Sequence, residues 1–255
     1  MIDAHIHLDQ YENIEMKINS WQKAGIKKVI AVSYDLASSY KTLELKEKFP
    51  DFILAGAGFH PEKGLPKESD FQEWQRLIRQ ERNNIACIGE IGLPHYELEK
   101  LPHSLESHMD FFKRCLHTAE EHSLPAALHA VYDKAAIVYE ILQQETPDIA
   151  AHFHWLKAQM EVVRQITAAG YYVSLTPEVC YRERDQVLAT FIPMEQLLME
   201  TDGPWPFKGP FEGKETTPLF LPDIAAFLAK ERKMNIHTLK EQILHNTMRL
   251  YGSNI

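Results

Sequence analysis

The stretch Lys28-Val-Ile-Ala-Val-Ser33 contains an unbroken run of apolar residues, Val29 to Val32. A short strand that is apolar on both faces is typical of a parallel sheet covered by helices on both sides. Working outward along the chain, further strand-like runs recur between longer segments with helical spacing. The eight expected strands cover residues 2–8, 28–33, 53–58, 85–91, 126–129, 149–154, 171–175 and 196–200.

The segments between these strands are expected to be helices. One apolar stripe at spacings of three and four residues predicts an amphipathic helix. This stripe consists of Leu105, Met109, Phe112, Leu116 and Ala119. The tetrapeptide Ser69-Asp-Phe-Gln72 resembles a capping box, which predicts that another helix begins there. The tail from about residue 218 to residue 252 is expected to supply closing helices.

Strands and helices therefore alternate along the whole chain. Eight β/α units favour an α/β fold of the (β/α)8 TIM-barrel type, formed as a single domain by residues 1–255. A doubly wound open sheet is the competing fold, but the sequence has no glycine-rich phosphate turn after its first strand. No repeat, low-complexity tract or Gly/Ser linker divides the chain.

The composition excludes several classes of protein. Of its residues 45% are apolar and 25% charged, which is ordinary for a globular domain and unlike a disordered or collagenous chain. A formal net charge of −9 disfavours broad binding to nucleic acid or to an anionic membrane. Neither a signal peptide nor an apolar run of about 20 residues is present, so no membrane association is expected. No stable protein partner is expected either.

The cysteines carry little functional information. Cys87, Cys115 and Cys180 are widely separated and form no CxxC pair. Such an odd, scattered set indicates neither a disulfide framework nor a thiolate zinc site, and it fits a reducing cytoplasm. Cys180 has no activating neighbour in the sequence and is expected to be an ordinary thiol.

Acidic and histidine residues gather at the expected carboxyl ends of the strands. His5 and His7 lie two residues apart, so both side chains would point to the same side of their strand. Four more such residues end later strands, namely Glu90, His129, His154 and Asp202. Each alone could be a helix cap, a hydrogen-bonded histidine or a paired acid. Together, at one barrel mouth, they would need a cation to offset their charge and desolvation, which favours a metal site.

This ordered set resembles the TatD family of metal-dependent hydrolases, a branch of the amidohydrolase-like barrels. The resemblance runs nearly from end to end. The matching motifs are Asp3-Ala-His5-Ile-His7, Gly58-Phe-His60-Pro61, Ile88-Gly-Glu90-Ile-Gly-Leu93, Leu128-His129, Phe153-His154-Trp155, Glu200-Thr-Asp202-Gly-Pro204 and Asn246-Thr-Met-Arg-Leu-Tyr251.

The resemblance implies a centre for two divalent ions. One ion would be held by His5, His7 and Asp202 and the other by His129 and His154, with Glu90 bridging them. It also implies phosphodiester hydrolysis by a metal-bound hydroxide, typically as a deoxyribonuclease. Asp202 is expected to accept the proton of the nucleophile. Ligands of this kind suit Zn, Mn, Fe, Co or Ni, and Mg where phosphate oxygens help.

Five further residues are candidates for substrate binding. His60, in the loop after the third strand, would face the substrate by the same resemblance, or else pack within its loop. Glu200 could orient a ligand or the attacking water, or form a structural salt bridge. Arg182, Arg184 and Lys214 follow the seventh and eighth strands, where barrels often bind phosphate, although a solvated charged loop is the alternative.

His152 competes with His154 as the ligand from the sixth strand, because the two repeat the spacing of the first strand. The match of Phe153-His154-Trp155 to the family favours His154. His152 would then face inward without binding metal, and Trp155 would pack at the rim.

Departures from the family pattern concentrate around the expected substrate. Pro94-His95 replaces an aspartate position, Val131 replaces an arginine, Lys157-Ala158 replaces Ser-Gly, and Glu212 and Thr216 stand where Arg and Asn are common. No metal ligand is lost. The loss of two cations weakens the case for a long anionic backbone as substrate.

Small phosphodiesters or the ends of nucleic acids are therefore the expected substrates. An amidohydrolase or lactonase that acts on a small carbonyl compound is the nearest alternative. A non-catalytic metal-binding or interaction protein is the alternative from a different class.

Overall fold

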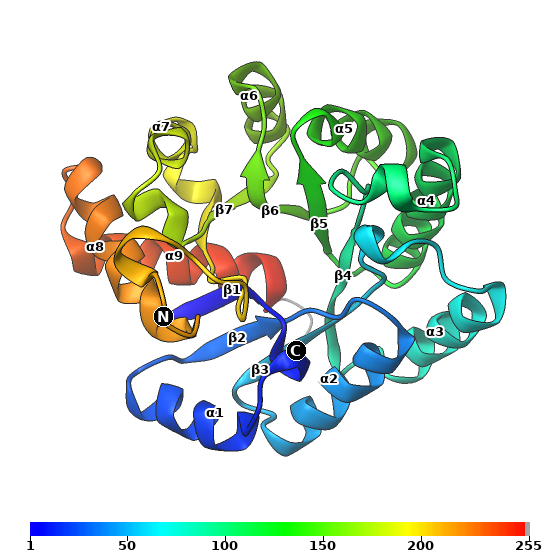
Figure 1. Cartoon of the computed structure of the whole chain (residues 1–255), viewed down its shortest axis with the longest axis horizontal. Coiled ribbons are helices and arrows are strands. Elements are labelled where there is room, and N and C mark those ends of the chain that lie inside the picture. The colour runs from blue at the N-terminus through cyan, green and yellow to red at the C-terminus, as the bar shows by residue number, and fades with distance from the viewer. Residues whose placement is uncertain (253–255) are drawn as a thin grey trace.

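The computed structural model describes residues 1–252, in which eight parallel strands pair in sequence order from β1 to β8. Figure 1 shows helices α1 to α8 arranged around these strands. The strands are β1 Ile2–Ile6, β2 Lys28–Ala31, β3 Ile53–Ala57, β4 Ile85–Gly92, β5 Ala126–Val131, β6 Ala151–Lys157, β7 Tyr172–Leu175 and β8 Leu197–Met199. Each predicted strand is present, with ends that differ from the predicted ones by at most three residues.

Backbone contacts just beyond β8 bring the last strand back to the first. Ile6 forms a parallel bridge with Gly203, whose carbonyl accepts a hydrogen bond of 2.8 Å from the amide of His7. The amide of Asp202 donates to the carbonyl of His5 at 3.0 Å. The sheet is therefore a nearly closed barrel, and the predicted (β/α)8 architecture is confirmed.

The helices alternate with the strands as predicted. They are α1 Ile14–Lys23, α2 Leu36–Lys48, α3 Glu68–Gln80, α4 Leu105–Glu121, α5 Asp133–Glu145, α6 Met160–Ala168, α7 Glu183–Phe191, α8 Leu221–Glu231 and α9 Ile236–Tyr251. The predicted stripe lies on α4, where Phe112, Leu116 and Ala119 are buried. None of the helices within residues 1–252 is long and apolar enough to cross a membrane.

The predicted capping box at Ser69 is wrong. Helix α3 already begins at Glu68, and the hydroxyl of Ser69 bonds the carboxylate of Asp70 at 3.1 Å. The chain does have a capping box at α2, where Asp35 accepts the amide of Ser38 at 2.7 Å. The pattern of Ser69 to Gln72 suggested a capping box because a serine inside the first turn can have the same spacing to a following glutamine as a serine at the N-cap.

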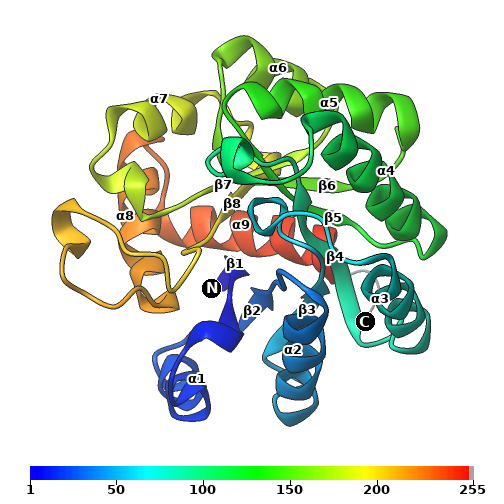
Figure 2. The same ribbon diagram turned by 45° about the vertical axis from the view of Figure 1, so that its right-hand side comes forward.

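Of the two helices in the tail, α9 covers the amino-terminal end of the barrel. Leu250 and Tyr251 of α9 pack with interior side chains such as Ile2, Ile30 and Leu198. Figure 2 shows α9 lying close to β8 and β1. With this end filled by apolar side chains, the opposite mouth, at the carboxyl ends of the strands, is left for polar groups. The eight strands form one sheet, and the single domain predicted over residues 1–255 stays a prediction.

Candidate metal centre and substrate pocket

The carboxylate of Glu90, on β4, lies at the centre of the barrel mouth among imidazole rings from four other segments. Its Oε2 lies 3.2 Å from Nε2 of His5 and 3.4 Å from Nε2 of His7. Its Oε1 faces three more nitrogens: Nε2 of His154 at 2.7 Å, Nδ1 of His129 at 2.9 Å and Nε2 of His60 at 3.3 Å. The two oxygens of one carboxylate therefore face two groups of imidazoles, which adjoin where the rings of His5 and His154 stack with centroids 3.9 Å apart.

The carboxylate of Asp202 joins the group on the Oε2 side. Its Oδ1 lies 3.6 Å from Nε2 of His5 and 3.5 Å from Nε2 of His7. The structure thus brings together all six side chains that the sequence analysis named as ligands, and none is more than 9% exposed.

The backbone around the site explains how these side chains reach one point. Asp202 has a left-handed backbone (φ 48°), a conformation that few residues other than glycine adopt and that is often found at functional sites. The buried Asp3 accepts hydrogen bonds from the amides of His5 at 3.3 Å and Thr201 at 2.9 Å. It therefore fixes the end of β1 against the segment that carries Asp202.

The approach of β3 to β4 also depends on a small residue. A Cβ atom at Gly58 would lie 2.5 Å from the carbonyl carbon of Gly89 and 2.7 Å from the amide nitrogen of Glu90. No side chain fits in that space, so glycine at this position lets the two strands come close enough to set Glu90 in place.

The charges in the site are strongly coupled. Burial disfavours charge on Glu90, but the imidazoles of His60, His154 and His5 hold the pKa of its carboxyl well below the usual range. Burial likewise disfavours charge on His7, yet Asp202 and Glu90 beside it raise its pKa to about 10. Two anionic carboxylates are thus kept in a buried site by the positive or polar groups around them.

The donor set fits a divalent cation. Oδ1 of Asp202 is buried and accepts no hydrogen bond among the described residues. The ligating atoms of His5, His7 and Glu90 lie within 4.8 Å of one another, and so do those of His5, His154 and Asp202. A buried carboxylate oxygen without a hydrogen bond is costly, and a cation bound between it and the imidazoles would remove that cost.

The contacts of His60 indicate which ring nitrogen carries its proton. Its Nδ1 accepts the amide of Glu62 at 3.2 Å, and burial lowers the pKa of the ring to about 3. A neutral ring that accepts at Nδ1 carries its proton on Nε2, the atom that faces Glu90. In this tautomer Nε2 is a hydrogen-bond donor rather than a metal ligand.

Glu62 is a site residue that the sequence analysis missed. Its Oε1 lies 3.3 Å from Nε2 of His129, and its two oxygens accept the amides of His95, Tyr96 and Glu97. These bonds keep the carboxyl ionised, with a pKa of about 2 despite burial. The only available signal was its position two residues after His60, since its partners come from a distant loop.

Glu200 lies beside His154 much as Glu62 lies beside His129. It is fully buried, and its Oε1 accepts the amide of Trp155 at 2.8 Å and lies 3.5 Å from Nδ1 of His154. His152 is also fully buried, with Nδ1 2.7 Å from the hydroxyl of Tyr251. These contacts favour an orienting position for Glu200 and an inward, non-ligating position for His152.

A cavity of about 670 Å³ opens over this cluster. Its wall includes His7, His60, Glu90, His129, His154 and Asp202, together with Tyr34, Glu62, Lys63, Tyr96, Glu97, Trp155, Lys157, Glu178, Arg182 and Trp205. The volume suits a ligand of the size of one or two nucleotides or a smaller metabolite.

The three cations predicted to bind substrate have different places. Arg182 lines this cavity but pairs with Glu178, while Arg184 pairs with Glu178 at 2.6 Å and lines a neighbouring cavity of about 440 Å³. Lys214 is exposed, donates to the carbonyl of Pro210 at 2.8 Å and is not among the described residues that line either cavity.

Burial raises the pKa of Cys180 to about 11, as expected for an ordinary thiol.

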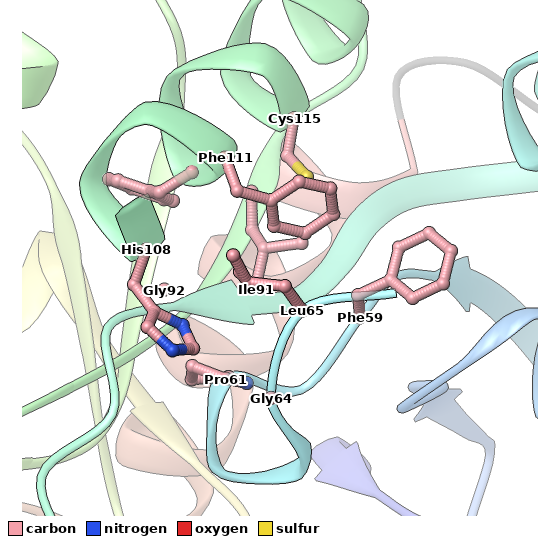
Figure 3. A pocket seen from close by; sticks show the side chains of 10 residues that line it. Phe59, Pro61, Gly64, Leu65, Ile91, Gly92, His108, Phe111 and Cys115 are labelled. Atoms are coloured by element: carbon pink, nitrogen blue, oxygen red, sulfur yellow. The ribbon is translucent and has the colours of Figure 1, made fainter. Parts of the chain in front are cut away.

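A much smaller cavity lies between β4 and α4. Figure 3 shows Phe111 and Cys115 of α4 above Ile91 and Pro61, with His108 at one side. Its volume of about 10 Å³ is near the minimum for a single water molecule, so it is too small for a substrate.

Comparison with known proteins agrees with this architecture. The family model described as TatD related DNase matches residues 2–252. An uncharacterized metal-dependent hydrolase of Haemophilus influenzae is 32% identical over 254 residues, covering 98% of this chain and 99% of that protein. The uncharacterized metal-dependent hydrolase YabD of Bacillus subtilis is 26% identical over 260 residues, covering all of both chains. The crystal structure of YJJV, a TatD homolog from Escherichia coli, has the same fold, with a TM-score of 0.86 at 20% identity over 99% of this chain and 98% of that one.

Proposed function

The chain belongs to the TatD family of metal-dependent hydrolases, and from that premise we propose that it hydrolyses phosphodiesters with two divalent ions bound at the barrel mouth. The observation that carries this proposal is the carboxylate of Glu90, whose two oxygens face two groups of imidazoles. A carboxylate in that position suits a ligand shared by two ions.

The residues divide between the two ions as follows. His5, His7 and Asp202 would hold one ion on the Oε2 side of Glu90, and His129 and His154 would hold the other on the Oε1 side. When bound, the ions would acidify a water molecule and polarise a phosphoryl oxygen. Glu62 and Glu200 would orient His129 and His154 from behind, as carboxylates commonly do for histidines that bind metal.

Asp202 and His60 would have different tasks in the reaction. Surrounding imidazoles keep the pKa of Asp202 below its usual value despite burial, so its carboxylate can accept a proton from the attacking water. His60 lines the cavity and carries its proton on Nε2, so it would donate a hydrogen bond to the substrate. Three free, well-separated cysteines fit a reducing compartment, and we propose the cytoplasm.

Two divalent ions per chain are the first expected result. The protein should be purified without chelator, its metal content determined by elemental analysis, and the chelated protein titrated with Zn, Mn, Mg, Fe, Co and Ni in turn. Saturation at two ions is expected because the ligands form two groups around one carboxylate. Saturation at one ion or none would contradict the two-metal arrangement.

The second expected result concerns the class of substrate. Small phosphodiesters and single-stranded ends should be hydrolysed, whereas long duplex DNA should bind poorly. Four carboxylates line the cavity, those of Glu62, Glu97, Glu178 and Asp202, and the chain carries a net charge of −9. These negative charges would disfavour binding of a long anionic backbone. The same metal-loaded protein should be assayed on a phosphodiester panel and on a panel of lactones and cyclic amides.

Two outcomes of that assay would argue against the proposal. Faster turnover of the carbonyl panel would favour an amidohydrolase or lactonase, and no turnover at full metal occupancy would favour a binding protein. Tight duplex binding that falls steeply with salt concentration would show that the surface binds nucleic acid backbone after all.

A further inference from the structure

Lys157 reaches the cavity because β6 is irregular. His152 and His154 face the barrel interior, so regular alternation would place Leu156 on the same side. Trp155 instead has a left-handed backbone (φ 38°), and the register between β5 and β6 shifts between His129 and Val131. As a result Leu156 is buried in the apolar core, and Trp155 and Lys157 line the cavity.

Lys157 is nearly buried but forms no ion pair with an acidic side chain of the described residues. The residue is 9% exposed, and its Nζ donates to the hydroxyl of Tyr96 at 3.0 Å. Nζ also lies 3.9 Å from the centroid of the Trp155 ring. Among residues 1–252 no carboxylate lies within ion-pair distance of it, whereas both Arg182 and Arg184 pair with Glu178.

An unpaired buried charge is unusual. An ammonium group has three donors, and the contact with Tyr96 uses only one of them. Burial lowers the pKa of Lys157, and the nearby carboxylates, of which Glu178 has the largest effect, offset this only in part. An anion that enters the cavity could accept hydrogen bonds from the remaining N–H groups and neutralise the charge of the ammonium group.

We propose that Lys157 binds a phosphate group of the substrate other than the one that is hydrolysed. This inference rests on the proposed phosphodiesterase function. The contacts of its Nζ are with the hydroxyl of Tyr96 and the ring of Trp155, which lie beside the reacting centre rather than within it. Lysine binds phosphate as a point charge, and a phosphate monoester at a chain end carries more negative charge than a diester.

The aromatic wall beside Lys157 supports a nucleotide rather than a bare phosphate. Trp205 is 59% exposed at the rim, and its ring centroid lies 6.2 Å from that of Trp155. Exposed rings of this kind can stack on bases of any sequence. The substrate class is therefore a short oligonucleotide that bears a terminal phosphate.

Lys157 also revises one conclusion of the sequence analysis. Val131, which stands where the family usually has arginine, is the register partner of Lys157 across β5 and β6. The positive charge expected on one strand is thus present on its neighbour. The cavity keeps a cation near that position, even though the fifth strand does not provide it.

The test compares thymidine dinucleotides that carry no terminal phosphate, a 5′-phosphate or a 3′-phosphate. The parent protein should prefer one phosphorylated form by about 10–100-fold in kcat/KM, the range for a hydrogen bond to a charged group. Lys157→Met should remove that preference, mainly through KM, and should lower kcat/KM far more for the phosphorylated substrate than for the unphosphorylated dinucleotide. No preference in the parent, or an equal loss on all three substrates, would overturn the proposal.

Two variants separate charge from packing. Lys46→Met removes a lysine of α2 that is about as buried, at 8% exposure, but that donates to the carbonyl of Pro50, just after this helix, and does not line the cavity. It should keep the preference for the phosphorylated substrate. Val131→Arg in the Lys157→Met background should restore part of the preference, because it returns a cation to the adjacent strand.

A binding measurement keeps the inference independent of turnover. Calorimetric titration should compare a nucleoside 3′,5′-bisphosphate with the corresponding monophosphates. Tighter binding of the bisphosphate by the parent, but not by Lys157→Met, would support the role of Lys157 even if no dinucleotide were hydrolysed. Equal affinities in both proteins would overturn that role, whereas absent hydrolysis with the expected affinities would count only against the proposed function.

Discussion

Glu90→Gln is expected to leave the protein with at most one tightly bound ion and to lower kcat/KM severely. A glutamine presents one oxygen and one NH2 group, so it can face a metal on one side only. Glu90 faces imidazoles with both oxygens, His7 and His5 at Oε2 and His129 and His154 at Oε1. The substitution therefore removes the shared ligand while changing the side-chain volume very little.

The loss of metal affinity in Glu90→Gln can be compared with the loss in a variant of a residue that only orients a ligand. Glu62→Gln changes the carboxylate behind His129 and should weaken metal binding by about 10–100-fold. Glu90→Gln should exceed that loss. Elemental analysis and thermal melts with and without added metal measure both variants, because an ion that binds only the folded state stabilises it by an amount that grows with the ratio of free ion concentration to dissociation constant. Two ions bound to Glu90→Gln with parental affinity would contradict a bridging carboxylate.

The barrel could be predicted from the sequence because its signals are local. Each strand is a short apolar run such as Val29 to Val32, and the separation between runs leaves room for one helix. The mouth could also be predicted, since parallel strands in a barrel end on the same side. His5, Glu90 and Asp202 lie far apart in the sequence, yet strand-end positions alone were enough to bring them together.

Residues placed by irregular backbone or by loops could not be predicted in this way. Alternation along β6 would send Lys157 out of the cavity, and only the left-handed residue Trp155 turns it inward. Glu62 lies in the loop after β3, and its carboxylate both contacts His129 and accepts the amide of His95 in the loop after β4. Contacts between two loops cannot be predicted from strand ends. Arg182 shares its loop with its partner Glu178, but the sequence gives no sign that the two side chains meet.

The tautomer of His60 is a further feature that requires coordinates. The sequence leaves open whether this histidine faces the substrate or packs within its loop, and it does not indicate which ring nitrogen carries the proton. In the structure the amide of Glu62 donates to Nδ1, so the proton of the neutral ring is on Nε2. In a histidine that binds metal, one ring nitrogen would contact the ion and the other would carry the proton. The side of Glu90 on which each ring lies indicates which ion it would bind.

Asp202→Asn is expected to reduce turnover by roughly 10²–10⁴-fold, the usual contribution of general acid–base catalysis, while most of the metal stays bound. An amide can bind metal through its oxygen but cannot accept a proton from the attacking water. His129→Ala should behave differently, because it loses an imidazole that faces Glu90 at 2.9 Å. Its metal occupancy should fall first, and part of its activity should return at high metal concentration.

The comparison must be made at matched occupancy, because an asparagine variant that had simply lost metal would imitate the loss of a base. Turnover should be measured across a metal titration, with bound metal determined on the same samples. The position of Asp202 supports the expected difference, since its carboxylate lines the cavity and its Oδ1 accepts no hydrogen bond from the described residues. If fully loaded Asp202→Asn turned over within a few-fold of the parent, Asp202 would not be the base. The sequence offers Glu200 or His60 as the next candidate; of these only His60 lines the cavity, where Glu62 is a further carboxylate.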